Sequence, residues 1–296
     1  MHSDTQHPLS DDRHEIMALW QETFRDSDAF VDLFFHRVFK PENTLVVKRN
    51  NRIISALQMI PCEVKVADSI LSSAYVCGVC TLPTERGKGI MHRLMADAMN
   101  VMRRKGYILS VLIPAESWLF DFYRKFGYIY PVSYTTEFYS PKDSSMSAEV
   151  SGYTFTLCTA ENGFPYFDRK QRERRCAVLH NVYDFETILR DLICDHGSTW
   201  IALKENKPAG IAFAKLESGS MIRIKEMLYD DPPAKKALVD HLLHLYHAQT
   251  AKIHLPFKPG KSIISVNLQI ESYGLACALD KQNREIADLY MSLMLD

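Results

Sequence analysis

The chain lacks long apolar runs, a dominant charge and an ordered set of cysteines. No apolar run in its 296 residues reaches the roughly 20 residues that a membrane-spanning helix needs. The formal net charge is -1, so no overall field would attract nucleic acid or an anionic membrane. The seven cysteines are odd in number and irregularly spaced, which does not predict a disulfide framework. We therefore expect a cytoplasmic protein with no membrane or nucleic-acid partner.

The sequence also lacks a leader and two familiar phosphate motifs. Its start, MHSDTQHPLSDDRHE, has neither the basic stretch nor the apolar core of a signal peptide. It contains no G-x-x-x-x-G-K-[ST], which excludes a Walker loop. It contains no G-x-G-x-x-G opening a dinucleotide unit.

Metal-binding patterns are weak. Cys77 and Cys80 form a single C-x-x-C, and three residues apart on a strand their side chains are expected on opposite faces. His241, His244 and His247 recur every three residues on a predicted helix, whereas metal pairs prefer a spacing of four. We expect no metal.

Apolar periodicity predicts two mixed units of helices and strands. Helical spacing covers about residues 11–40 with a break at Arg25–Asp28, and Asn50–Asn51 separates two strand-like runs. A third strand, a helix to about Lys105, another strand and a short helix at Ser117–Tyr128, capped by Ser117, follow. We expect domains at 1–140 and 153–256, a polar linker at 141–152, and a short β-rich segment at 257–296.

The stretch TLPTERGKGIM (Thr81–Met91) is a glycine-rich cationic turn between an apolar strand and an amphipathic helix. A helix N-terminus offers free N–H groups and a partial positive charge, which favour phosphate. Gly87 and Gly89 allow close backbone approach, and Arg86 and Lys88 add charge. A diphosphate suits this turn. The alternative is a solvated basic turn that only caps the helix.

This turn resembles the acetyl-CoA signature of GCN5-related N-acetyltransferases, an apolar strand followed by R-G-x-G-x-[GA]. Here the signature is Arg86 to Met91, and FYRKFGY (Phe122–Tyr128) resembles the family's tyrosine-bearing helix. Met91 departs from the usual small residue and should point away from the ligand. A large residue there, a long helical N-terminus and a degenerate second unit resemble the enhanced-intracellular-survival branch, known for acetylating aminoglycosides.

The resemblance implies an α/β (α+β) fold, a mixed sheet flanked by helices, in both units, and an acetyl-CoA-dependent N-acetyltransferase. It implies that the pantetheine arm lies beside the strand and the diphosphate at the turn. The implied cofactor-binding residues are Val79, Cys80, Thr81, Arg86, Gly87, Lys88, Gly89, Ile90 and Met91. The second unit has DDPPAKK at the matching place, where Asp230 and Asp231 would repel phosphate. We expect one cofactor site per chain.

Catalysis needs a proton for the leaving thiolate and a neutral amine. The resemblance assigns the acid to Tyr123; the alternative is a core aromatic. For the base, the branch suggests the terminal carboxylate, here Asp296, although the shortened C-terminus weakens this and an ordinary edge strand is the alternative. Glu116, after the strand ending at Pro114, is a second candidate base; its alternative is a solvated loop carboxylate. A water relay is a third route.

The acceptor should bind between the early helices and the strand at 53–64. A cationic amine would suit acidic and aromatic side chains, for which the candidates are Phe24, Asp26, Asp28, Glu63 and Trp118. The expected acceptor is a primary amine on a small molecule, for which the branch suggests an aminoglycoside-like compound. The rival functions are a non-catalytic acyl-CoA sensor and a scaffold. A homo-oligomer is left open.

Overall fold

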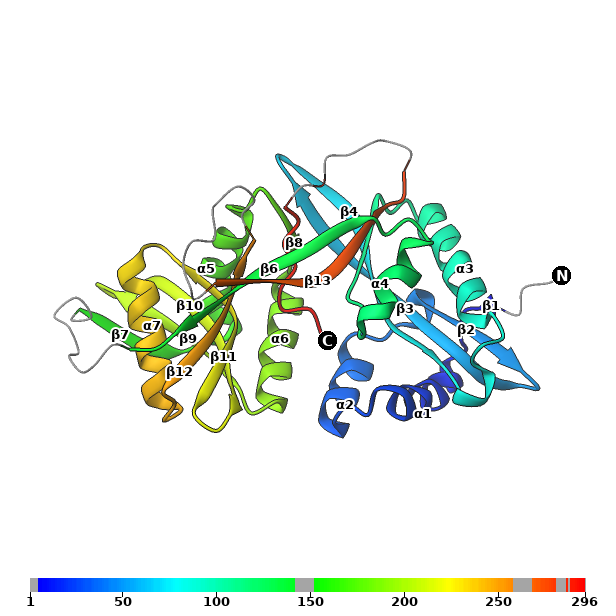
Figure 1. The fold of residues 1–296 in the computed structure, drawn as a ribbon, viewed down its shortest axis with the longest axis horizontal. Coiled ribbons are helices and arrows are strands. Elements are labelled where there is room, and N and C mark those ends of the chain that lie inside the picture. Colours follow the sequence, from blue (N-terminus) through cyan, green and yellow to red (C-terminus); the bar gives the residue numbers. More distant parts are fainter. Residues whose placement is uncertain (1–4, 142–151, 258–267, 281–285, 287, 296) are drawn as a thin grey trace. The chain divides into compact units, whose positions relative to one another are not determined.

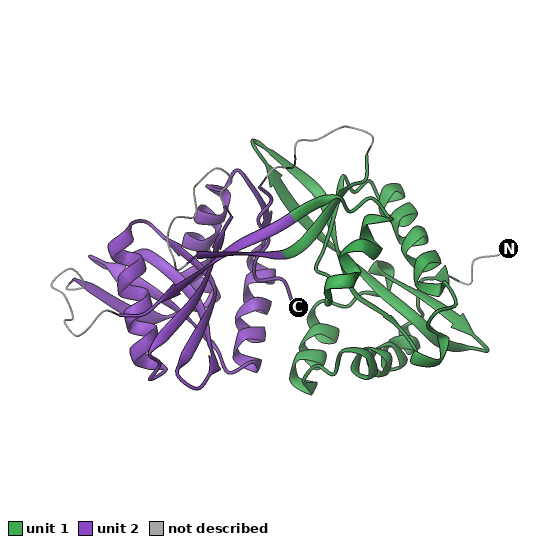
Figure 2. Ribbon diagram, viewed as in Figure 1, with its two compact units in different colours: residues 1–131, 273–287 green, residues 132–272, 288–296 purple. Residues whose placement is uncertain are grey.

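The computed structural model describes residues 5–141, 152–257, 268–280, 286 and 288–295. It divides into two compact units, one of residues 1–131 and 273–287 and one of residues 132–272 and 288–296 (Figure 2). The expected linker at 141–152 lies almost wholly outside the described residues, as do large parts of the expected segment at 257–296. Those domain boundaries stay a prediction.

Unit 1 is a mixed sheet with helices on its faces (Figure 1). Its strands follow the order β1-β2-β3-β4-β5-β13, antiparallel except for the parallel pair β4–β5. Its elements are β1 (Thr5–Gln6), η1 (Ser10–Asp12), α1 (Arg13–Phe24), α2 (Asp28–Arg37), η2 (Pro41–Asn43), β2 (Thr44–Arg49), β3 (Arg52–Val66), β4 (Ser69–Thr81), η3 (Pro83–Glu85), α3 (Ile90–Arg104), β5 (Leu109–Leu112), α4 (Ser117–Arg124) and the end of β13 (Leu268–Ala278).

The helices of unit 1 form where apolar spacing predicts them. The break between α1 and α2 falls at the expected place, where Arg25 has left-handed geometry and the Ser27 side chain accepts the Phe30 N–H. The apolar face of α3 packs on the sheet in one core with residues of β2 to β5 and α4. Sheet and helices thus hold the end of β4 and the start of α3 in place.

The short helix α4 is a partial correction. It spans Ser117–Arg124, and its N-cap is the extended residue Glu116 rather than Ser117. It ends before Tyr128 because Phe126 and Gly127 donate tight three-residue turn bonds to Tyr123 and Arg124. The glycine expected past its end, Gly127, has a φ of 92°.

Unit 2 repeats this kind of architecture. Its sheet order is β6-β12-β11-β10-β9-β7, in which β11 and β12 are parallel and the other neighbours antiparallel. Its elements are β6 (Tyr130–Tyr139), which starts in unit 1, β7 (Tyr153–Leu157), α5 (Ala160–Arg172), β8 (Cys176–Leu179), α6 (Val182–Cys194), β9 (Ser198–Lys204), β10 (Lys207–Ser218), β11 (Met221–Tyr229), α7 (Pro232–Leu245) and β12 (Thr250–Pro256).

Two apolar cores cover the two faces of the unit 2 sheet. One lies under α7, and the other lies under α5 and α6 (Figure 1). The C-terminal segment joins the second core through Leu293. Its Tyr290 exchanges backbone hydrogen bonds with Cys176 and Val178 at 3.1 and 3.0 Å. This segment therefore lies beside β8 of the same unit and pairs with it in parallel. The mixed α/β fold class expected from the sequence is confirmed.

Candidate active site

A β-bulge interrupts β4 just before its end. Gln58 of β3 lies opposite Cys77, and Ala56 lies opposite Cys80, so β4 takes three steps where β3 takes two. Gly78, inside the bulge, has a φ of 57°. A Cβ on Gly78 would lie 2.1 Å from the Trp20 ring, so only glycine fits there. The bulge bends the strand beneath α1.

The bulge corrects the expectation for Cys77 and Cys80. Facing residues of antiparallel strands share a side, and Ala56 and Gln58 are two apart, so both cysteines point to the same side of the sheet. In a regular strand, residues three apart point to opposite sides; the extra residue in the bulge brings Cys77 and Cys80 back to the same side. Burial raises the pKa of both thiols, that of Cys80 to about 12. Both are neutral, free thiols at physiological pH.

Beyond the bulge, β4 and β5 no longer pair. Their last parallel pair joins Val76 and Leu112. The Leu82 N–H donates to Ile54 at 2.9 Å, so by the alternation of antiparallel ladders the N–H and C=O of Thr81 point away from β3. The Thr81 carbonyl there accepts a hydrogen bond from Arg86 Nε at 3.1 Å. The strand edge and the cationic turn therefore meet at Thr81.

The turn that follows presents unpaired donors. Gly87 and Gly89 have φ values of 76° and 73°, and no atom lies within 4 Å of where a Cβ would stand on either. Gly89 caps α3 without a side-chain hydrogen bond. Within the described part of the chain, no backbone acceptor pairs with the N–H groups of Gly87, Lys88 or Gly89. Together with the free first turn of α3, they form an open cluster of donors.

The charges around the turn favour an anion. Glu85 pairs with Arg49 and, at 3.1 Å, with Lys88. The hydrogen bond from Lys88 is the main cause that lowers the pKa of Glu85. With Arg86, which bonds to Thr81, the turn and its ion pairs contain three cations and one carboxylate, which leaves a local surplus of positive charge. Met91 packs, partly buried, against the α3 core rather than standing in the turn.

Tyr123 lies on α4 and is 5% exposed. Its ring packs edge-on against Phe122 and Tyr128. Burial raises the pKa of its phenol, and the neighbouring Cys77 and Cys80 raise it further. This coupling places Tyr123 near the bulge of β4. A phenol with a raised pKa stays protonated at neutral pH, so it can donate a proton.

The candidate bases differ in what the structure shows. Glu116 accepts a hydrogen bond from the indole of Trp118 at 2.6 Å, and Trp118 itself is 60% exposed. Asp296 lies outside the described residues. Neither assignment is tested by the structure, and both stay predictions.

The candidate acceptor residues fall into separate groups. Trp20 and Gln21 of α1 contact three of them: Trp20 packs against Phe24 and donates to Asp26 at 2.7 Å, and Gln21 donates to Asp28 at 2.6 Å. Trp118 belongs to α4 with Tyr123. Glu63 is exposed on β3 opposite Ser72, on the far side of the β4–β5 pairs from the bulge. The structure does not bring Glu63 to the others.

Two residues of this region were missed by sequence reasoning. Gly78 had a signal, because a lone glycine inside a strand pattern indicates a bulge or a close approach. Gln58 had none: it is 1% exposed, and neither its amide nitrogen nor its amide oxygen has a hydrogen-bond partner among the described residues. A buried amide without partners marks a place that a water or a polar ligand would satisfy.

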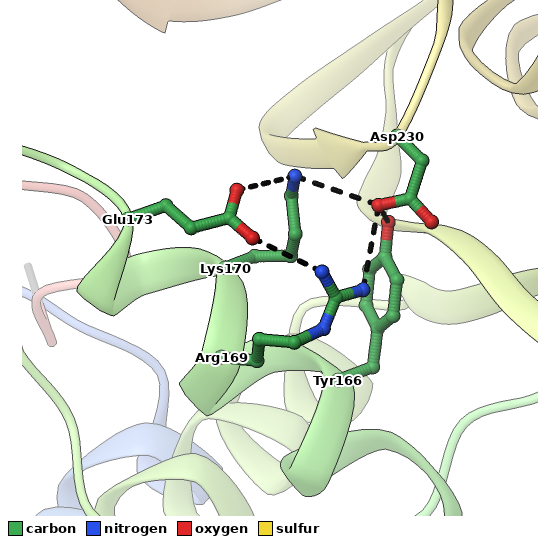
Figure 3. Close-up of polar contacts among 5 residues, drawn as sticks. All are labelled: Tyr166, Arg169, Lys170, Glu173 and Asp230. Atoms are coloured by element: carbon green, nitrogen blue, oxygen red, sulfur yellow. Dashed lines mark hydrogen bonds and ion pairs between the residues drawn. The ribbon is translucent and has the colours of Figure 1, made fainter.

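The matching turn of unit 2 is closed. Asp231 caps α7, and its carboxylate accepts the Ala234 N–H at 2.8 Å. Asp230 accepts hydrogen bonds from Tyr166 and Arg169, and Lys170 lies 3.5 Å from it and 2.6 Å from Glu173 (Figure 3). The carboxylates expected to repel phosphate thus also take up the donors around them.

Residues 6–130 match the family model of the acetyltransferase (GNAT) domain. No curated protein matches the chain. Three solved structures share its fold, although only about one residue in six is identical. They are a conserved Enterococcus faecalis V583 protein, a probable N-acyltransferase (16% identity, 93% of this chain and 72% of that one, TM-score 0.75), a GCN5-related N-acetyltransferase from Anabaena variabilis (16%, 93% and 72%, 0.73), and Eis1 from Mycobacterium abscessus (15%, 93% and 74%, 0.67).

Two kinds of feature are absent among the described residues. No helix there is both long and apolar enough to span a membrane. No group of three or more histidine, cysteine or acidic side chains there could hold a metal ion.

Proposed function

We propose that the chain is an N-acetyltransferase that moves an acetyl group from acetyl-CoA to a primary amine of a small molecule. One observation carries this proposal: the open, cationic donor cluster from Arg86 to the start of α3, directly after the bulged end of β4. The match of residues 6–130 to the acetyltransferase (GNAT) domain supports it. An aminoglycoside-like acceptor is the finer form of the proposal, and it rests on the sequence resemblance to the enhanced-intracellular-survival branch.

The cofactor would be held by main chain more than by side chains. The N–H groups of Gly87 to Gly89 and of the first turn of α3 suit a diphosphate, with Arg86 and Lys88 adding charge. The outward edge of β4 at Thr81 suits an amide-bearing arm added beside the strand. When bound, the coenzyme supplies an acetyl group activated as a thioester.

The chain's own groups would then handle protons. Tyr123, neutral and buried beside the bulge, would donate its phenolic proton to the departing sulfur. A low-dielectric site also favours the neutral form of an entering amine. Asp26 and Asp28, held by Trp20 and Gln21, would attract a cationic acceptor. Glu116, Asp296 or a water would accept the amine proton.

The test is thiol release from acetyl-CoA with a panel of amines, for the parent chain and for Tyr123→Phe. The phenylalanine variant should keep its affinity for acetyl-CoA and lose about 100-fold or more in kcat, within the range of general acid catalysis. Tyr183→Phe, which makes the same change at an exposed tyrosine of α6 in unit 2, is the matched control. Binding of acetyl-CoA without turnover across the panel would reduce the protein to an acyl-CoA sensor. Absence of binding would refute the proposal.

A further inference from the structure

Unit 2 contains a cavity of ≈ 810 Å³ that the proposed reaction does not use. It opens where β11 and β12 diverge. Their last parallel pair joins Ile224 and Ile253; beyond it β12 continues beside β6 as far as Pro256, while β11 continues beside β10. The volume lies within the range of small-molecule sites, about 300–1,000 Å³.

One wall of the cavity is a free strand edge. The Asp230 N–H donates to Ala209 at 2.9 Å, so in the alternating ladder the N–H and C=O of Tyr229 and Met227 point away from β10. The Met227 N–H confirms this direction, because it donates to the Glu226 carboxylate at 2.9 Å instead of to β10. Within the described residues, nothing pairs with the backbone N–H of Tyr229 on this side. An extended chain with amide groups would complete such an edge.

The rest of the lining is mostly apolar. It includes Met227, Leu228, Leu255, Pro256, Phe257 and Leu268. Tyr290 also lines the cavity; it is 4% exposed, and its hydroxyl lies near Glu226, Arg174 and Ser292 without a hydrogen bond of normal geometry to any of them. A buried hydroxyl without a partner is costly unless a ligand or water satisfies it. The cavity thus combines an apolar wall with the Tyr290 hydroxyl and a set of charged side chains.

The charges around the cavity are balanced in pairs. Lys170 lies 2.6 Å from Glu173, and Figure 3 shows the two side chains pointing toward each other. Arg174 makes two 3.0 Å hydrogen bonds to Glu226, and Glu137 lies 2.7 Å from Lys235. The exposed Arg175 and Asp288 contribute one charge of each sign.

Paired charges leave no surplus to attract an ion. A phosphate would also meet the carboxylates of Asp230 and Asp231 at the end of β11. The lining therefore favours an uncharged ligand.

We propose that this cavity binds a small, uncharged, extended secondary amide with an apolar substituent, which adds as a strand to the free edge of β11. The amide pairs with the N–H and C=O of Tyr229, the substituent packs on Met227 and Leu255, which face the same core, and a polar end reaches the Tyr290 hydroxyl. This site is independent of the acetyltransferase proposal, since every residue that forms it belongs to unit 2. Both a pantetheine thioester and a capped dipeptide carry this chemistry.

The experiment titrates the full chain with S-hexanoylpantetheine and, separately, with N-acetyl-Leu-Leu-methylamide, followed by saturation-transfer NMR and calorimetry. Leu255→Trp fills the cavity and should weaken binding of the active probe at least tenfold. Tyr229→Pro removes the free N–H without removing a bond to β10, and it should weaken binding at least fivefold more than Tyr229→Ala, which removes the same ring but keeps the N–H. Urea unfolding verifies that each variant folds.

The outcomes separate clearly. Binding of either probe that is lost in Leu255→Trp supports the proposal and identifies which source of the amide the cavity accepts. Binding that is unchanged in Leu255→Trp and Tyr229→Pro lies elsewhere and overturns it, as does the absence of binding by both probes at millimolar concentration. If Tyr229→Pro does not fold, the comparison of Leu255→Trp with Leu255→Val decides.

Discussion

The helices α3 and α7 each follow a β-strand that has one antiparallel and one parallel neighbour. Their N-terminal N–H groups nevertheless differ in what they bind. At α3 the cap is Gly89, with no side chain to take up the free N–H groups. At α7 the cap is Asp231, whose carboxylate accepts one of them at 2.8 Å. A helix that supplies its own anion has less capacity to bind an external one.

The strand ends differ in the same sense. Each strand is followed by a residue whose N–H bonds back at 2.9 Å, Leu82 after β4 and Asp230 after β11. Gly78 in unit 1 and Glu226 in unit 2 occupy equivalent positions, because each precedes its bonded residue, Leu82 or Asp230, by the same number of positions along the chain. Gly78 leaves room for Trp20 only, whereas Glu226 is fully buried and caps the next N–H. One fold therefore keeps donors open in one unit and closes them with carboxylates in the other.

The largest test of this contrast is Arg174→Met in unit 2. Arg174 pairs with the fully buried Glu226 through two hydrogen bonds and lies 4.1 Å from the Tyr290 ring centre. Its loss leaves a buried charge unpaired, which should cost about 3–5 kcal/mol in the free energy of unfolding. Urea unfolding measures it. The control, Arg174→Met with Glu226→Gln, removes both charges and should recover most of the loss; equal losses in the two variants would show that packing dominates.

A second test moves the acidic cap into unit 1. Gly89→Asp places a carboxylate at the start of α3, and Gly89→Asn is the matched neutral change, since both residues tolerate left-handed geometry. Under the proposed function, the aspartate should weaken acetyl-CoA binding about 100-fold, and the asparagine about tenfold or less, because charge repulsion adds to lost access. Calorimetry measures both affinities. Similar affinities for the two variants would remove the electrostatic argument.

Particular residues show how far the sequence predicted this molecule. Gly87 and Gly89 indicated a ligand-facing turn, and the structure gives both a positive φ and open space. Asp230 and Asp231 indicated a turn that repels phosphate, and the structure adds that Asp231 caps α7. These features depend on residues that are close together in the chain, so they can be predicted from a single sequence.

Other features depend on residues far apart in the chain. The isolation of the Gln58 amide, the pairing of Arg174 with Glu226 and the common side of Cys77 and Cys80 require strand register, which the local pattern does not contain. The same limit explains Glu63, which the sequence grouped with Asp26 but the register places opposite Ser72.

Acid should destabilise unit 2 through His254. Burial, with Arg223 and Lys252 nearby, lowers its pKa to about 4, against opposing effects of Glu271 and Glu217. Its unfolded-state pKa is about 6.5, so between these values the unfolded chain binds more protons and stability falls as the pH falls. We expect about 2 kcal/mol to be lost from pH 7 to pH 5 at this residue.

The measurement is urea unfolding across that range. His254→Phe keeps an aromatic ring against Tyr134, on which His254 stacks at 4.2 Å, but cannot titrate. The variant should therefore show a flatter dependence on pH. An unchanged slope would place the acid sensitivity in other groups, such as His180 and His241, whose pKa values burial also lowers.

The smallest expected effect separates the two roles of the α7 cap. Asp231→Ala removes the acceptor for the Ala234 N–H and should cost about 1 kcal/mol in unfolding free energy, whereas Asp231→Asn can still cap and should cost less. Asparagine also removes the negative charge, so the pair distinguishes capping from electrostatics. If capping is what closes this turn, the alanine variant should gain stability from added pyrophosphate and the asparagine variant should not. If charge closes it, both should respond, because both variants lack the Asp231 carboxylate.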